Sequence, residues 1–352
     1  MSARTEGSSN YEYVTARVRS RRAKLFDADD YRKLVRMGPS EIARFMEDTE
    51  YEAEMNALGT RHSGVDLIEY ALNRNLAKHF DDLLTWADGS LYEYIANYLR
   101  KFDAWNVKTV IRGIYTDADA QEIEDDLIRT GEFSRQTLDR LAEAASIEDA
   151  IEVLSGTIFG EPLEDAYEDF DSSDVLVPLE NAVDRAFFSH LLDDIGQPEP
   201  DTAMALYREF LEAEIDFRNL RNALRIARSG AEIDPAEYFI EGGRLFDGDE
   251  LRQLASNTDE LVTRIRESGY GDDLTDALDE LETATSLIGF ENALNAALLE
   301  YSEKLSNRYP LSISPVLSYI LAKEREIENI RAIARGREAG LSVEEIEEEL
   351  VQ

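Results

Sequence analysis

The sequence predicts an all-α protein built from three similar helical units, and three observations carry this prediction. Apolar residues recur at spacings of three, four and seven along most of the 352-residue chain, which is the period of a helix with one buried face. One motif occurs three times in related form, and the segments around it recur in the same order. No convincing β-hairpin pattern interrupts the series.

The first unit is a succession of helical patterns. They are LFDADDYRKLVRMG from Leu25, LIEYALNRNLAKHF from Leu67, LYEYIANYLRKF from Leu91, the motif FDAWNVKTVIRG from Phe102 and AQEIEDDLIRTG from Ala120. One predicted buried face is formed by Ile68, Leu72, Leu76 and Phe80, and another by Val107, Val110, Ile111 and Ile114. The residues Asp88-Gly89-Ser90 mark a helix start between them.

The second and third units repeat these patterns in the same order. The second contains EFSRQTLDRLAEAA from Glu132, PLENAVDRAFFSHL from Pro178, the motif IDFRNLRNALRI from Ile215 and PAEYFIEGGRLF from Pro235. The third contains LFDGDELRQLASNT from Leu245, GFENALNAALLEYS from Gly289, the motif REIENIRAIARG from Arg325 and SVEEIEEELVQ from Ser342. We therefore expect units of about 110 residues at 12–130, 131–243 and 244–352, whose helices superpose.

Helix ends carry their own signals. Pro315 after Ser314 suits a first helical turn, and Ser342 with Glu345 forms a capping box. Gly113, Gly230 and Gly340 stand where we expect helices to weaken or end.

The recurring polar residues form a signature. They are the acids Asp103, Asp216 and Glu326, the asparagines Asn106, Asn219 and Asn329, the arginines Arg112, Arg225 and Arg335, and, in the preceding helix, Glu69, Glu180 and Glu291, which are 111 residues apart. Asparagine is a mediocre helix former, so its recurrence favours a side-chain hydrogen bond to an adjoining helix or loop. The arginines could bind carboxylates such as those glutamates. A structural bracket is favoured over a ligand site.

The charge is strongly acidic, with 75 acidic and 37 basic residues and a net charge of −38. In molar salt the screening length falls to roughly 3 Å, so the composition is typical of proteins from salt-accumulating microbes. The acidic charge argues against nucleic acid and anionic membranes as partners.

The absence of cysteine excludes disulfides, thiolate catalysis and Cys-based metal sites. No apolar run approaches the roughly 20 residues of a membrane helix, and the N-terminus lacks an apolar signal region, so we expect a soluble, unexported chain.

Candidates for chemistry are few. His62, His79 and His190 lie in no metal-binding pattern, and surface or packing roles are favoured. The acidic runs from Asp117 and Asp169 lack the glycine of a calcium-binding loop, so solvated charge explains them better. No nucleotide-binding loop or nucleophile elbow is present, and no catalytic, cofactor-binding or metal-binding residue is assigned.

One dense basic stretch, RVRSRRAKLF, runs from Arg17 to Phe26. It could bind a polyanion or a lipid headgroup. A solvated helix face, or a strip that pairs with this chain's own acids, is favoured because the remaining surface repels polyanions.

Several segments together carry a family resemblance. YEYVTARVRSRRAKLF, EIARFMEDTEY, FDAWNVKTVIRG, FLEAEIDFRNLRNALR and YPLSISPVLSYILAKEREIENIRAIARG resemble the C subunit of the archaeal A-type ATP synthase, which is equivalent to the d subunit of vacuolar ATPases. The resemblance extends over nearly the whole chain, including the triplication.

The resemblance implies a three-lobed helical funnel with approximate threefold symmetry, seated on the cytoplasmic end of the proteolipid rotor ring. Its cavity would receive the tip of the central stalk, built of the D and F subunits. Such a protein has no active site and no cofactor; it transmits torque between the soluble and membrane sectors. The family offers no catalytic motif to place on this sequence, and it does not identify the residues that contact ring or stalk.

Without the resemblance, the repeats also suit a helical scaffold that binds a partner peptide in a groove. An enzyme is a more distant alternative. Three large units favour a closed arrangement over a solenoid, which commonly has more and smaller repeats.

Overall fold

Several helices begin at a short polar side chain that caps the first turn. In the computed structural model, Asp27, Asp119 and Ser342 each form a capping box, at the starts of α2 (Ala28–Leu34), α8 (Ala120–Asp126) and α19 (Val343–Glu349). The side chain accepts hydrogen bonds from N–H groups that the first turn leaves without partners. The box predicted at Ser342 is confirmed.

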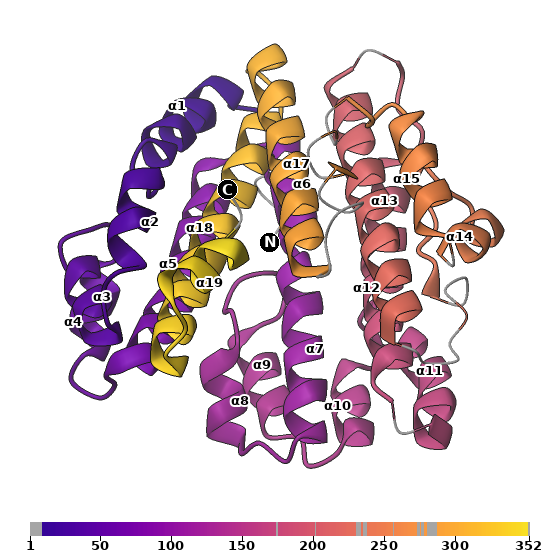
Figure 1. The fold of residues 1–352 in the computed structure, drawn as a ribbon. Helices are drawn as coiled ribbons and strands as arrows, with labels where there is room; N and C mark the ends of the chain where they lie inside the picture. Colours follow the sequence, from indigo (N-terminus) through magenta and orange to yellow (C-terminus); the bar gives the residue numbers. More distant parts are fainter. Residues whose placement is uncertain are drawn as a thin grey trace. The chain divides into compact units, whose positions relative to one another are not determined.

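The structure describes residues 9–350 except 174, 201, 230–233, 235–237, 256, 273–274, 276–277 and 280–286. Every regular element among these residues is a helix (Figure 1). The predicted all-α class is confirmed.

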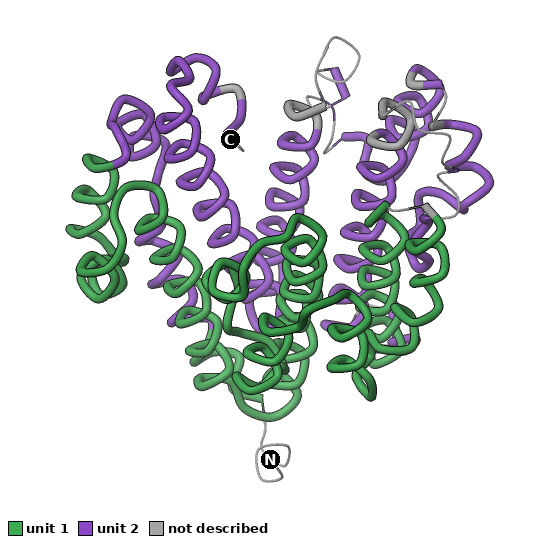
Figure 2. Tube along the Cα trace, turned by 90° about the horizontal axis from the view of Figure 1, so that it is seen from below, with its two compact units in different colours: residues 1–14, 40–194 green, residues 15–39, 195–352 purple. Residues whose placement is uncertain are grey.

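The chain divides into two compact units, drawn in different colours in Figure 2. Unit 1 comprises Met1–Val14 and Ser40–Asp194, and unit 2 comprises Thr15–Pro39 and Ile195–Gln352. Helix α1 (Tyr11–Arg22) begins in unit 1 and continues in unit 2. The three units expected from the repeats and their funnel arrangement stay predictions.

Unit 1 is organised around two helices. Its helices are α3 (Pro39–Met46), α4 (Glu52–Leu58), α5 (Gly64–Trp86), α6 (Ser90–Leu99), α7 (Lys101–Tyr115), α8, α9 (Arg135–Ala142), α10 (Ile147–Leu154), α11 (Gly160–Ser173) and α12 (Val177–Ile195). Helix α5 packs against α4, α6 and α8, and α7 packs against α6, α8, α9 and α10. The predicted face Ile68, Leu72, Leu76 and Phe80 is buried in this core.

Unit 2 contains the long helices α13 (Ala203–Ser229), α17 (Leu287–Arg308) and α18 (Ser314–Ala339). They are accompanied by α2, α14 (Gly248–Ala255), α15 (Thr258–Arg266) and α19. Helix α17 packs against both α13 and α18, while α2 and α19 pack against α18. Pro315 lies in the first turn of α18, as the sequence predicts.

Two of the glycines expected near helix ends lie there. Gly340 ends α18 in the left-handed conformation, with φ of 79°, and α7 ends at Tyr115, two residues after Gly113. A Cβ at Gly113 would lie 2.5 Å from Cγ1 of Ile123, so this glycine admits the side chain of α8. Gly230 lies outside the described residues.

Candidate functional site

The asparagines of the repeated motif hold the chain that follows their helix. On α7, Asn106 Nδ2 donates to the carbonyl oxygen of Ile128 at 2.7 Å, and the Ile128 N–H donates back to Oδ1 at 2.8 Å. On α13, Asn219 makes the same pair of hydrogen bonds with Ile240, both at 2.8 Å. One amide thus satisfies a buried backbone donor and acceptor together. We call this pair of bonds the asparagine bracket.

The third asparagine lies in a related setting. Asn329 is buried on α18 and hydrogen-bonds the side chain of Tyr31. Burial, followed by the charge of Glu326, raises the pKa of Tyr31. The residue that corresponds to Ile128 in the repeat is Val351, which lies outside the described residues.

The three acids of the motif each bind one or two backbone N–H groups that lie just before a helix. Asp103 accepts from Glu132 at 2.7 Å and from Phe133 at 3.1 Å, ahead of α9. Asp216 accepts from Arg244 at 3.0 Å and Leu245 at 2.9 Å, ahead of α14. Glu326 accepts from Phe26 at 2.5 Å, ahead of α2. Each acid therefore anchors a chain segment that enters a helix, and we call these three contacts the acid junctions.

Two junctions depend on glycine. A Cβ on Gly131 would lie 2.5 Å from Oδ1 of Asp103, and one on Gly243 would collide with Oδ1 of Asp216. The short aspartate side chain reaches the backbone because the glycines leave that space open. The third junction has Lys24 and Leu25 before Phe26, and its acid is the longer glutamate.

Burial dominates the electrostatics of these acids. It raises the pKa of Asp103 to about 7 from the ordinary 3.8, although the two backbone hydrogen bonds and Arg100 act in the opposite direction. Burial likewise raises the pKa of Asp216, which also accepts a hydrogen bond from the hydroxyl of Tyr270 at 3.1 Å. Glu326 is paired with Lys323 at 2.7 Å, and both side chains are almost fully buried.

Basic residues of the motif brace helices of the same unit. Arg112 on α7 pairs with Glu180 on α12, and Lys108 pairs with Asp184 at 2.6 Å. In unit 2, Arg221 donates to Asn295 at 2.6 Å. Of the remaining signature residues, Arg335 is exposed on α18, and Glu69 and Glu291 are half-buried on α5 and α17. The side chain of Arg225 lies outside the described part of the chain.

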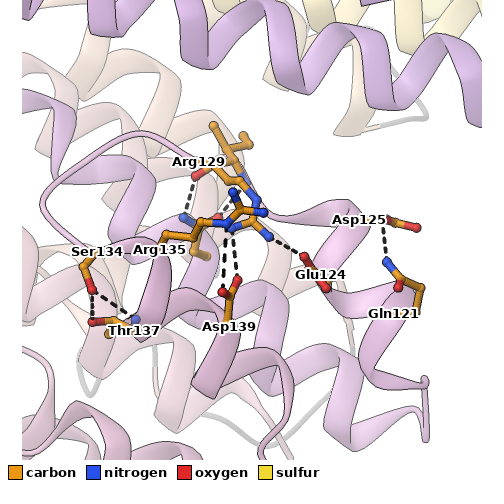
Figure 3. A network of polar contacts seen from close by, with 10 residues as sticks. Gln121, Glu124, Asp125, Arg129, Ser134, Arg135, Thr137 and Asp139 are labelled. Atoms are coloured by element: carbon orange, nitrogen blue, oxygen red, sulfur yellow. Dashed lines mark hydrogen bonds and ion pairs between the residues drawn. The ribbon is translucent and has the colours of Figure 1, made fainter. Parts of the chain in front are cut away.

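A polar network covers the loop after Ile128 (Figure 3). Arg129 pairs with Glu124 of α8 at 2.6 Å and with Asp139 of α9 at 3.1 Å, and Arg135 approaches the same aspartate. Ser134 caps α9 through the N–H of Thr137. The network stabilises the loop that also carries the first asparagine bracket and the first acid junction.

The histidines singled out in the sequence all have packing or polar contacts. His62 packs against Tyr70, His79 is buried, and His190 contacts Arg100 and Asp194. Across the described residues, no three histidine or acidic side chains gather as a metal site. In the basic stretch, Arg22 pairs with Glu303 and contacts Ser318.

A cavity of about 350 Å³ lies in unit 2, next to the third acid junction. It is lined on one side by Phe26, Tyr31 and neighbouring residues of α2, and on the other by α18 and α19, through Arg325, Asn329, Glu347 and Leu350.

The sequence did not identify the acid junctions, although it showed the acids to recur. Nothing local in the sequence indicates that Asp103 accepts from residues about 30 positions later. The available signal was Gly131 and Gly243, which precede the bound N–H groups and recur between the units.

In the described part of the chain, no helix has the length and apolar character of a membrane-crossing segment.

Known proteins match this chain over nearly its whole length. The model of the ATP synthase (C/AC39) subunit family matches residues 14–349. The C subunit of the A-type ATP synthase of Haloferax volcanii is 66% identical over 99% of both chains. The proteins of the same name from Halobacterium salinarum and Methanococcoides burtonii are 58% and 36% identical, over 98% of this chain and 98% and 95% of theirs. An all-helical chain with repeated brackets, matched end to end by these proteins, belongs to the ATP synthase (C/AC39) subunit family.

Proposed function

We propose that this chain is a non-catalytic subunit of an A-type ATP synthase that links the central stalk to the proteolipid ring in the membrane. The observation that carries the proposal is the 66% identity over 99% of both chains with a protein named as the C subunit of an A-type ATP synthase. In this role the chain couples ATP synthesis to proton or sodium transport. Its partners are the proteolipid ring and the D and F subunits of the stalk, and it lies peripherally on the cytoplasmic face of the cell membrane.

The internal contacts suit a part that transmits torque. Torque requires a body that does not bend, and α13, α17 and α18 are 27, 22 and 26 residues long. The asparagine brackets and acid junctions fix the loops beside such helices with buried hydrogen bonds. Buried polar networks whose members are satisfied rigidify a core.

The contacts with ring and stalk should be polar and distributed. A body with threefold lobes must meet a ring and a stalk that do not share its symmetry, so one deep anchor would not fit. Single substitutions on the contacting surface should then weaken assembly only modestly.

Deletion of the gene, with complementation by the wild-type chain as control, tests the proposal. ATP hydrolysis by the soluble sector should persist, while its coupling to ion transport across membrane vesicles should be lost. Purified chain should hydrolyse no ATP. Full coupling after deletion would contradict the proposal. It would favour the alternative function, a scaffold that binds a partner peptide. Purification of the chain from native membranes would then identify that partner.

A further inference from the structure

The segment Thr15–Pro39 is held on unit 2 by contacts spread along its length, and we call it the clasp. Thr15 Oγ1 donates to the carbonyl oxygen of Pro310 at 3.1 Å, Arg22 pairs with Glu303, Phe26 N–H binds Glu326, and Arg337 Nε donates to the carbonyl oxygen of Met37 at 3.2 Å. Its apolar face is buried through Val18, Phe26, Leu34 and Val35. Residues on both sides of the clasp belong to unit 1.

The clasp occupies the third acid junction, which differs from the others in sequence separation. The acid and its bound N–H groups are 29 and 30 residues apart at Asp103, and 28 and 29 apart at Asp216. At Glu326 the separation is 300 residues. A short connection keeps a released segment close to its acid. The first two junctions have such a connection, whereas the segment at the third is tied at both ends to residues of unit 1.

The third junction is also attached differently to its acid. Asp103 and Asp216 each bind two consecutive backbone N–H groups, whereas Glu326 binds the N–H of Phe26 and the buried ammonium group of Lys323. Burying the charges of Lys323 and Glu326 carries a large desolvation penalty, because both groups lose their water. When the clasp opens, water solvates this pair again, and the free energy regained lowers the free energy that opening requires.

The cavity beside the junction weakens the packing further. Its walls are the clasp on one side and α18 with α19 on the other. The cavity is partly open to solvent, so the side chains that line it do not pack against each other across it. The clasp thus leaves its seat at the loss of fewer contacts than a fully packed segment of this length.

We propose that the clasp opens as a unit, separating from α18 while the rest of unit 2 stays folded. The surface it covers, with Ser318, Lys323 and Glu326, then becomes exposed intermittently in the native protein. The clasp stays attached to the chain at both ends and can close again.

Helix α14 provides an internal control for a first test. It occupies the second acid junction in the position that α2 occupies in the third. Hydrogen exchange of the wild-type chain in molar salt should show protection factors about 10-fold or more lower over 28–34 than over 248–255. Equal protection of the two helices would overturn the proposal.

The cysteine-free sequence allows a second test with single thiols. Ser318→Cys places a thiol beneath the clasp, and Ala213→Cys places one equally deep on α13, away from it; both parent residues are 0% exposed. A thiol reagent should label the first variant about 10-fold or more faster than the second, without denaturant.

A third substitution sharpens this comparison. Adding Glu326→Gln removes the charge that holds the clasp, so labelling of the Ser318→Cys variant should accelerate while labelling of the Ala213→Cys variant stays unchanged. Equal rates for the two thiols, or parallel acceleration of both, would show that only global unfolding exposes them and would overturn the proposal.

Discussion

At the scale of single residues, the asparagine bracket requires an amide side chain, because the same group both donates and accepts. Asn106→Ala leaves a buried N–H and a buried carbonyl of Ile128 without partners. Each such group costs roughly 1–3 kcal/mol, so the free energy of unfolding should fall by about 2–6 kcal/mol. Chemical denaturation in molar salt measures this loss.

The matched control is Asn97→Ala, which removes a more exposed hydrogen bond, to Asp194. It should lower the free energy of unfolding by less than about 1 kcal/mol. Similar losses for the two variants would refute the assignment of a buried bracket at Asn106.

Asp103 should leave a signature in the pH dependence of stability. Its pKa is raised to about 7 in the folded state, mainly by burial, from the ordinary 3.8. The folded state therefore holds the proton more tightly than the unfolded state. The stability that this proton contributes is complete below pH 3.8 and is lost as pH rises toward about 7.

The comparison is between wild type and Asp103→Asn, by denaturation from about pH 4 to about pH 8. The stability of wild type relative to the variant should decrease as pH rises through this range. Asp48→Asn, at an exposed acid, corrects for the loss of one charge from an acidic chain. A difference between wild type and Asp103→Asn that does not vary with pH would count against the buried carboxyl as its source.

At the scale of elements, two helices approach each other through glycine. Gly336 on α18 faces Ile346 of α19, as Gly113 on α7 faces Ile123 of α8, and a Cβ at Gly336 would lie 2.8 Å from Cγ1 of Ile346. Gly to Ala inside a helix ordinarily stabilises by about 0.5–1 kcal/mol. Here overpacking should reverse the sign, and Gly336→Ala should destabilise by about 1–2 kcal/mol.

A double-mutant cycle, read by chemical denaturation, separates crowding from helix propensity. Ile346→Ala removes the obstructing atoms, so Gly336→Ala should cost nothing further in that background. Gly269→Ala, whose Cβ would meet no atom within 4 Å, is the control and should be nearly neutral. An unchanged penalty in the Ile346→Ala background would rule out the proposed contact.

The elements also show what the sequence could predict. Helices, their caps and the buried face of α5 follow from periodicity and from residues close together in the chain, such as Ser342 and Glu345. The close approach of Gly113 to Ile123 joins two helices, and the sequence near Gly113 does not reveal it. The junction of Glu326 with Phe26 joins residues 300 positions apart, and no local pattern encodes such a contact. Recurrence identified the signature residues and suggested the glutamates as partners of the arginines, as Arg112 and Glu180 show, but the backbone partners of the acids and asparagines required the fold.

At the scale of the whole molecule, charge should govern the response to salt. With a net charge of −38, the surface repels itself when salt is removed. The screening length grows from roughly 3 Å in molar salt to roughly 10 Å at about 0.1 M, so the folded state should lose stability over that range. The melting temperature, followed by circular dichroism, should fall as salt is lowered. A constant or rising melting temperature would defeat the argument.

The asparagine brackets respond to salt differently from the surface. Their donors and acceptors are amides, buried and uncharged, so screening has nothing to act on. The buried hydrogen bonds and the acidic surface are therefore separable properties of this sequence. During evolution from high to low salinity, surface acids could be exchanged for lysines one at a time while the brackets kept the helices in place. The same substitutions could be engineered to give a variant that is stable at low salt.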